Sequence, residues 1–287
     1  MGLFQAIALG LIQGIAELFP ISSAAHTLLI SWLLGWTPPS LPFVVMLHLG
    51  TFLAVLVYFA RDYWEIVTGL FTGLSDRWAR PNERLAILIV LGTLPLAVLG
   101  YLLEKRLDPL FGNPLVAAIG LLVTGVVLFA VERMPQHTGE AEQLPLVRAI
   151  WVGLSQIAGL IPGGSRSGFS IAAGMLAGLS REQAARFSFL LAGPAILGAS
   201  VFELRRIIKP HPGVIETVHG FGSVAAAPEP TAIIVVGFFA ALISGIFAIR
   251  FFMRFVDQHR LTPFAIYCWL FGLFSLAVIL ARGHTAA

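Results

Sequence analysis

Two charged side chains stand alone in long apolar stretches of the chain. Glu17 is the only charged residue in the interval 2–60, and Arg166 is the only one in the interval 149–180. A charge at membrane depth costs about 2.5–3.5 kcal/mol on insertion scales, and such charges are kept where they have a partner or a function. Both residues are therefore candidates for catalysis or ligand binding.

Polar side chains lie close to Glu17 in the sequence. Gln13 comes four residues earlier, so it shares a helix face with Glu17. Ser22 and Ser23 follow a proline break, where hydroxyl groups cap a new helix and free N–H groups point outward. His26 comes three residues after Ser23, on the same side of that helix. These groups are suited to cation binding, proton transfer or nucleophilic attack.

A turn rich in glycine and serine carries Arg166. It reads PGGSRSGFS and places Ser165, Ser167, Gly168 and Ser170 around the arginine, ahead of an apolar helix. A helix N-terminus of this kind binds anions through converging N–H groups. The guanidinium adds a planar fork that matches phosphate oxygens. The turn lacks the GK[ST] ending of a P-loop, so a nucleotide is not implied.

Structural roles are the alternatives for these residues. His26 would then be a buried histidine satisfied by a backbone carbonyl. Glu17 would form a structural ion pair with Arg166, although pairing and catalysis can coexist. The turn around Arg166 would be a flexible hinge with an interfacial arginine.

Together the two segments favour phosphate chemistry. A carboxylate and a phosphate in one low-dielectric pocket repel each other unless a cation lies between them. We therefore expect Mg²⁺ or Ca²⁺, with Glu17 and the Gln13 amide as oxygen ligands. Neither segment holds a second carboxylate, so the phosphate is expected to complete the shell. The chemistry that fits is hydrolysis of a phosphate ester or anhydride whose substrate has a lipid body.

Composition shows what must position these groups. Of the 287 residues, 57% are hydrophobic and only 11% are charged, whereas soluble domains carry about 25% charged residues. Too few charges are present to cover a water-exposed surface, which excludes a soluble globular protein, a nucleic-acid binder and a disordered scaffold. The single cysteine, Cys268, excludes a disulfide framework and a thiolate zinc site. The chain is predicted to be an integral membrane protein.

Six charge-free stretches are long enough to cross a hydrocarbon layer of about 30 Å. They are the intervals 41–60, 85–103, 114–131, 187–203, 231–249 and 262–281.

Two further apolar intervals are interrupted. The interval 2–35 breaks at LFPISS and the interval 149–180 at IPGGSRSG, leaving pieces too short to span. Lipid tolerates irregular backbone only where protein or water surrounds it. We expect two re-entrant helical hairpins whose tips meet inside the bilayer and bring Glu17 and Arg166 into one crevice.

The two halves of the chain resemble each other. GLIQGIAELFPISS (10–23) matches GLSQIAGLIPGGSRS (153–167) at a shift of 142–143 residues. The predicted fold is an all-α polytopic membrane protein forming a single membrane domain over residues 1–287. It contains two inverted-topology repeats, 1–133 and 147–281, each a re-entrant hairpin plus three transmembrane helices. The alternative is similarity through apolar composition alone.

Loop charges predict the orientation. If the 61–84 loop lies inside, then the 132–148 and 250–260 loops do too, and the inside loops carry more Lys and Arg. This places the N-terminus outside and opens the first hairpin to the outside.

The sequence resembles undecaprenyl pyrophosphate phosphatase, the bacitracin-resistance family of integral membrane enzymes. The likeness covers nearly the whole chain and is most specific at QGIAELFPISSAAH and PGGSRSGFS. RFSFLLAGP (186–194) and TPFAIY (262–267) are also similar to family segments. Departures are Ala24 and Ala25, where Ser or Thr and Gly are usual, and Ser170 in place of Thr.

The resemblance implies removal of the terminal phosphate from a C55 polyprenyl diphosphate carrier, at a site on the outer (periplasmic) side of the bacterial plasma membrane. By this resemblance, Gln13 and Glu17 form the acidic element that binds metal or activates water. Ser23 and His26 form the nucleophile or proton-transfer pair. The phosphate-binding loop contains Ser165, Arg166, Ser167 and Ser170. The partners implied are a long-chain polyprenyl diphosphate and membrane lipids, without nucleic acid, and a homodimer is one option for the assembly.

Three routes for the attack stay open. His26 or Ser23 attacks in line, or Glu17 activates a water. Gly168 and Ser22 are further candidates for phosphate contact. The main rival function is a polyprenyl-phosphate transporter or flippase that uses the same midplane site, because inverted hairpins are a transport architecture.

Overall fold

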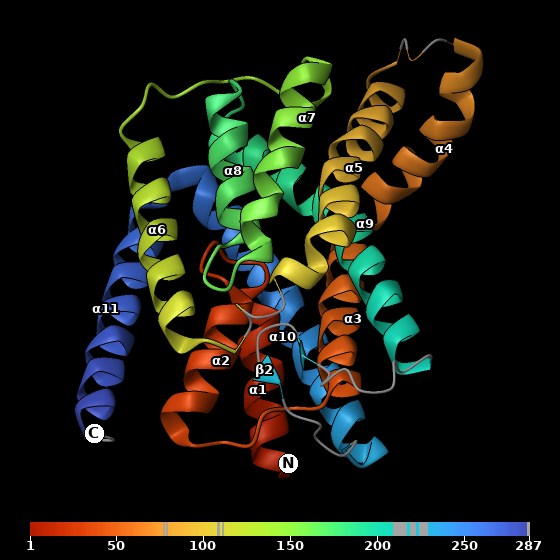
Figure 1. Ribbon diagram of the computed structural model, residues 1–287. Coiled ribbons are helices and arrows are strands. Elements are labelled where there is room, and N and C mark those ends of the chain that lie inside the picture. Colours follow the sequence, from red (N-terminus) through yellow and green to blue (C-terminus); the bar gives the residue numbers. More distant parts are fainter. Residues whose placement is uncertain are drawn as a thin grey trace.

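The fold is built almost entirely from α-helices (Figure 1). The computed structural model describes residues 1–76, 78, 80–107, 110, 112–208, 217–218, 222–223 and 229–285. Within these residues the strands are β1 (Thr217–Val218) and β2 (Gly222–Ser223), an antiparallel pair of two residues each. The predicted all-α polytopic class is confirmed. Most of the 204–230 connection lies outside the described residues.

Six helices in the described chain are long and apolar enough to cross a membrane. They are α3 (Leu41–Tyr58), α5 (Pro81–Leu107), α6 (Pro114–Glu132), α9 (Arg181–Ile208), α10 (Thr231–Gln258) and α11 (Thr262–Thr285). Each corresponds to one of the six predicted spans. Helices α9 and α10 extend beyond the charge-free stretches because a helix continues past the apolar layer as long as its charged residues find partners or water.

Four shorter helices form two hairpins. They are α1 (Leu3–Ala16), α2 (Ser23–Leu34), α7 (Leu146–Ser155) and α8 (Arg166–Leu176), and a 3₁₀ turn, η3 (Gln156–Leu160), follows α7. In Figure 1, α1 and α2 lie at the end of the bundle that holds the N-terminus, α7 and α8 lie at the opposite end, and their connecting loops meet in between. The relation of the two halves as inverted repeats stays a prediction.

In both hairpins a serine caps the N-terminus of the helix that follows the break. Ser22 has a φ of 68° and its hydroxyl accepts a hydrogen bond from the Ala25 amide, which starts α2. Ser165 accepts from the Gly168 amide at 3.1 Å, which starts α8. Each cap satisfies an amide that would otherwise be unpaired at a helix start buried in the protein.

Glycines let α1 approach α10 closely, and this contact positions Glu17 at the end of α1. A Cβ atom at Gly10 would lie 2.6 Å from the Gly237 carbonyl oxygen, and one at Gly14 would lie 2.0 Å from the Ser244 hydroxyl. Small residues at such positions let membrane helices approach backbone to backbone.

The interval 61–84, expected to be a loop, instead contains a helix. Helix α4 (Ala60–Asp76) is amphipathic, and its large apolar side chains Trp64, Phe71 and Leu74 are exposed. Their spacing of seven and three residues places them on one helix face. The prediction was wrong because charged residues at both ends of the segment concealed this periodicity.

Candidate active site

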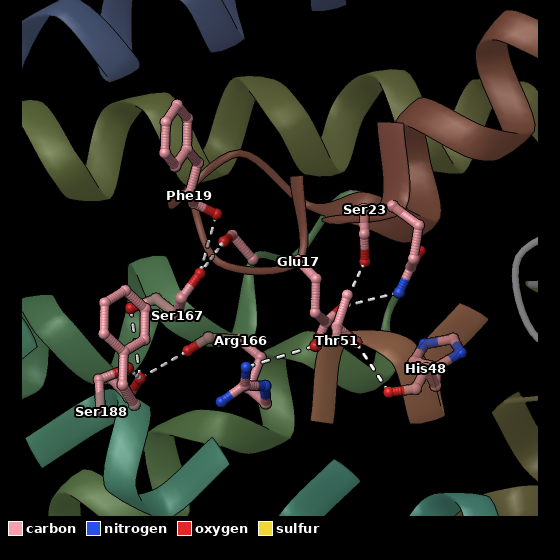
Figure 2. Close-up of polar contacts among 12 residues, drawn as sticks. Glu17, Phe19, Ser23, His48, Thr51, Arg166, Ser167 and Ser188 are labelled. Atoms are coloured by element: carbon pink, nitrogen blue, oxygen red, sulfur yellow. Dashed lines mark hydrogen bonds and ion pairs between the residues drawn. The ribbon is translucent and has the colours of Figure 1, made fainter. Parts of the chain in front are cut away.

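Glu17 and Arg166 lie beside each other although 149 residues separate them (Figure 2). The Arg166 Nη2 atom is 3.3 Å from Glu17 Oε1, and their side chains are 12% and 11% exposed. Both line one cavity. The expectation that the two isolated charges share a crevice is therefore confirmed.

The Glu17 carboxylate is held by donors from its own hairpin. Ser23 donates to Glu17 Oε2 at 2.5 Å, and Gln13 Nε2 donates to the same oxygen at 3.4 Å. In Figure 2, Glu17 lies between Ser23 and Arg166. A carboxylate held from both sides keeps one orientation, and its contact with the Ser23 hydroxyl is short enough for proton transfer.

The turn around Arg166 is tied to the first hairpin. The Ser167 hydroxyl donates to the Phe19 carbonyl at 2.9 Å and lies 3.2 Å from the Ser165 hydroxyl. Arg166 Nη1 is buried and has no hydrogen-bond partner among the described residues. Because buried donors are almost always satisfied, this nitrogen is suited to an incoming anion.

Gly168 and Ser170 support the turn and do not line the cavity. The Ser170 hydroxyl donates to the Arg166 carbonyl at 2.8 Å and lies 2.6 Å from the Ser188 hydroxyl. The Gly168 amide is occupied by the Ser165 cap. Direct phosphate contact by either residue stays a prediction that this arrangement does not favour.

His26 points away from the cavity. Its Nδ1 lies 2.8 Å from the Ser22 carbonyl oxygen and its Nε2 lies 2.8 Å from the Tyr267 hydroxyl. The ring is 3% exposed and stacks on Tyr267 and Phe271. This is the arrangement of a buried histidine satisfied by a carbonyl. Helical spacing predicted that His26 lies on the same side of α2 as Ser23. In the structure the His26 ring instead packs against α11.

The cavity has a volume of about 360 Å³. Its polar end is lined by Gln13, Glu17, Ser22, Ser23, Ser165, Arg166 and Ser167. Its remaining walls are largely apolar and come from α3, α5 and the part of α9 that follows Pro194. It reaches the first turn of α3, at the end of the bundle that holds the N-terminus (Figure 1). The shape fits a charged headgroup joined to an apolar chain.

Two residues that line the cavity, Gln156 and His48, were not predicted as site residues from the sequence. Gln156 is fully buried, its Nε2 faces the Gly92 carbonyl at 3.5 Å, and its Oε1 has no partner among the described residues. It stands 143 residues after Gln13, so the repeat alignment already contained the signal. His48 lines the cavity from α3 and was hidden inside a predicted span.

Comparison with known proteins identifies the family. The family described as "Bacitracin resistance protein BacA" matches residues 6–274. The chain belongs to the BacA family.

Curated proteins named undecaprenyl-diphosphatase resemble the chain over nearly its full length. An undecaprenyl-diphosphatase of Geotalea daltonii is 37% identical over 281 residues, which cover 97% of this chain and 99% of that protein. One of Mycolicibacterium paratuberculosis is 38% identical over 312 residues, with 97% of both chains covered. One of Methanobrevibacter smithii is 37% identical over 283 residues, with 95% of this chain and 96% of that protein covered.

The residues present fit a divalent cation that draws on the substrate for ligands. Among the described residues, no three His, Cys, Asp or Glu side chains gather into a metal-binding group. The Glu17 carboxylate and the Gln13 amide are oxygen ligands of the kind that Mg²⁺ and Ca²⁺ prefer. Two such groups are too few for a site made by protein alone, so a diphosphate would have to supply further oxygens.

Proposed function

We propose that this protein hydrolyses undecaprenyl diphosphate to undecaprenyl phosphate and inorganic phosphate, which returns the lipid carrier to peptidoglycan synthesis. The observation that carries the proposal is the Arg166–Glu17 pair at the polar end of an otherwise apolar cavity. Membership of the BacA family and the names of its curated relatives support the same reaction. They do not favour a flippase.

The chain's own residues account for binding and proton transfer. The Arg166 guanidinium and the first two amides of α8, those of Arg166 and Ser167, hold the terminal phosphate and stabilise the charge that develops on it. The bond from the terminal phosphorus to the bridging oxygen breaks, and the lipid monophosphate leaves. Glu17 accepts the proton of the attacking group, which is either a water or the Ser23 hydroxyl 2.5 Å away. If the Ser23 hydroxyl attacks, the phosphoryl group is transferred to the serine, and a water then cleaves this phosphoserine to release inorganic phosphate.

A divalent cation, Mg²⁺ or Ca²⁺, belongs to the proposal. Glu17 and Gln13 would hold it together with the diphosphate. When bound, such an ion offsets the negative charge of the phosphate and polarises its oxygens.

The proposed location is the bacterial plasma membrane, with the cavity open to the outer, periplasmic side. The six apolar helices support a multi-pass arrangement. The excess of Lys and Arg in the segments 61–84, 132–148 and 250–260 supports an outside N-terminus. The cavity extends toward that same end of the bundle.

The proposed reaction is tested by phosphate release from purified protein in detergent. With a long-chain isoprenyl diphosphate we expect release of one inorganic phosphate per lipid, abolished by a chelator and restored by excess Mg²⁺ or Ca²⁺. Detergent removes the second compartment, so a transporter would release nothing. Lipid movement across vesicles without any hydrolysis would contradict the proposed reaction.

A second prediction concerns the attacking group. Because both ring nitrogens of His26 are hydrogen-bonded outside the cavity, rapid quenching of a reaction with substrate radiolabelled at its terminal phosphate should give no phosphohistidine. Label should appear on Ser23 or on no residue at all, the latter if water attacks directly. An acid-labile phosphate mapped to His26 would overturn this prediction.

A further inference from the structure

Helix α9 contains a proline at the point where it reaches the cavity. Pro194 has no amide hydrogen, so the carbonyl of Leu190, four residues earlier, lacks its helical donor. Within a membrane-spanning helix a free carbonyl is costly because lipid offers no replacement donor. A group from elsewhere in the protein must therefore satisfy it.

Tyr63, in the first turn of α4, supplies this donor. Its hydroxyl donates to the Leu190 carbonyl at 3.0 Å and lies 3.4 Å from the Phe189 carbonyl. Burial raises the pKa of Tyr63, so the hydroxyl keeps the proton that it donates.

Gly193 makes room for this contact. A Cβ atom at Gly193 would lie 2.0 Å from the Tyr63 hydroxyl oxygen. The neighbouring residues Gly193 and Pro194 thus both contribute to this hydrogen bond. Gly193 leaves space for the Tyr63 hydroxyl, and Pro194 leaves the Leu190 carbonyl without a helical donor.

An ion pair holds the same two helices one turn away. Asp62, next to Tyr63, lies 2.6 Å from Arg186 Nη2, and Arg186 Nη1 lies 2.7 Å from Glu142. Arg186 and Leu190 are four residues apart, so they share a face of α9. The first turn of α4 therefore contacts α9 at two successive turns, just before the proline.

The part of α9 beyond the proline forms a cavity wall. Pro194, Ala195, Ile196 and Ser200 line the cavity. Glu17 and Arg166, by contrast, lie on the two hairpins. The direction in which α9 leaves Pro194 therefore places this wall, whereas the charged pair lies on other elements.

We propose that Tyr63 is a positioning residue: its hydroxyl replaces the amide hydrogen that Pro194 lacks, fixes the course of α9 and so places the apolar wall that receives the lipid chain of the substrate. This inference rests on the proposed phosphatase function. It assigns lipid-chain binding to a contact made outside the cavity.

The test is Tyr63→Phe, which removes only the hydroxyl. We expect KM for a long-chain isoprenyl diphosphate to rise about three- to tenfold, the range of a single buried hydrogen bond in a membrane protein. The kcat should stay within about twofold, because a weakened binding wall affects bound and reacting substrate alike. Tyr58→Phe, a partly exposed tyrosine on α3, is the matched control and should leave both constants unchanged.

A double-variant cycle separates this role from general destabilisation. Pro194→Ala restores an amide hydrogen for the Leu190 carbonyl, so adding Tyr63→Phe to it should change KM no further. An equal KM effect in both backgrounds, an unchanged KM in Tyr63→Phe, or a fall in kcat alone would overturn the proposal. If Tyr63→Phe alone does not fold, the double variant Tyr63→Phe/Pro194→Ala decides. A double variant that folds and has the same KM as Pro194→Ala supports the proposal. A double variant that does not fold overturns it.

The two proposals fail in different ways. If wild-type protein releases no phosphate, the phosphatase function is wrong. If wild-type protein is active and the cycle shows no coupling between Tyr63 and Pro194, only the positioning role is wrong.

Discussion

Replacing Arg166 by alanine is expected to lower kcat/KM for the lipid diphosphate by about 10³-fold, the range seen when an arginine or an oxyanion donor is removed from a phosphoryl- or acyl-transfer site. The physical reason is that the guanidinium is a positively charged group at the polar end of the cavity, and its Nη1 nitrogen is buried without a partner among the described residues. Steady-state phosphate release measures the effect.

Controls separate chemistry from folding in this prediction. Arg166→Lys keeps the charge but loses the planar fork, so it should recover only part of the activity. Arg133→Ala, an exposed arginine over the Phe129 ring, should leave activity unchanged. Because alanine leaves the Glu17 carboxylate without its cationic partner, the unfolding midpoint of each variant is measured alongside. Near-wild-type turnover of a folded Arg166→Ala protein would contradict the role of Arg166 in phosphate binding.

The second large effect is expected for Glu17→Gln, with a fall in kcat of about 10²–10⁴-fold, the usual contribution of a general base. Glutamine keeps the shape of the side chain but neither accepts the proton of the attacking group nor offers a charged ligand to a cation. Its hydrogen bond from Ser23 can still form, so folding should change less than activity. Phosphate release at saturating substrate measures the loss.

Cation titration extends the Glu17 test. Glu65→Gln removes a carboxylate that forms an exposed pair with Arg61, and it should leave turnover and cation response unchanged. In Glu17→Gln, residual activity should need a higher concentration of Mg²⁺ or Ca²⁺. An unchanged cation dependence would remove Glu17 as a ligand, and unchanged turnover would remove it as a base.

Much of the fold follows directly from local sequence. Six spans were predictable because a membrane helix needs a continuous apolar stretch, and each charged boundary is visible in the chain. The hairpin breaks were predictable from Pro20 and from the glycines before Arg166. The meeting of Glu17 and Arg166 was predictable too, since two isolated charges at membrane depth are most stable together.

Other features depended on which neighbours pack against each helix. Spacing along α2 placed His26 with Ser23, but α11 offers Tyr267 as a partner and turns the ring away from the cavity. Ser170 has the spacing of a phosphate ligand, yet Ser188 of α9 occupies its hydroxyl. In both cases the competing partner lies on another helix.

By itself, then, the sequence determined the membrane-spanning α-helical fold, the two interrupted hairpins and the charged pair that makes phosphate chemistry plausible. Only the tertiary structure decided that His26 is buried among aromatic rings, that Gln156 reaches the cavity and that Tyr63 satisfies the carbonyl left free by Pro194. The physical reason is that residue spacing reports the face of a helix on which a side chain lies. The partner that meets that face is set by the packing of distant segments.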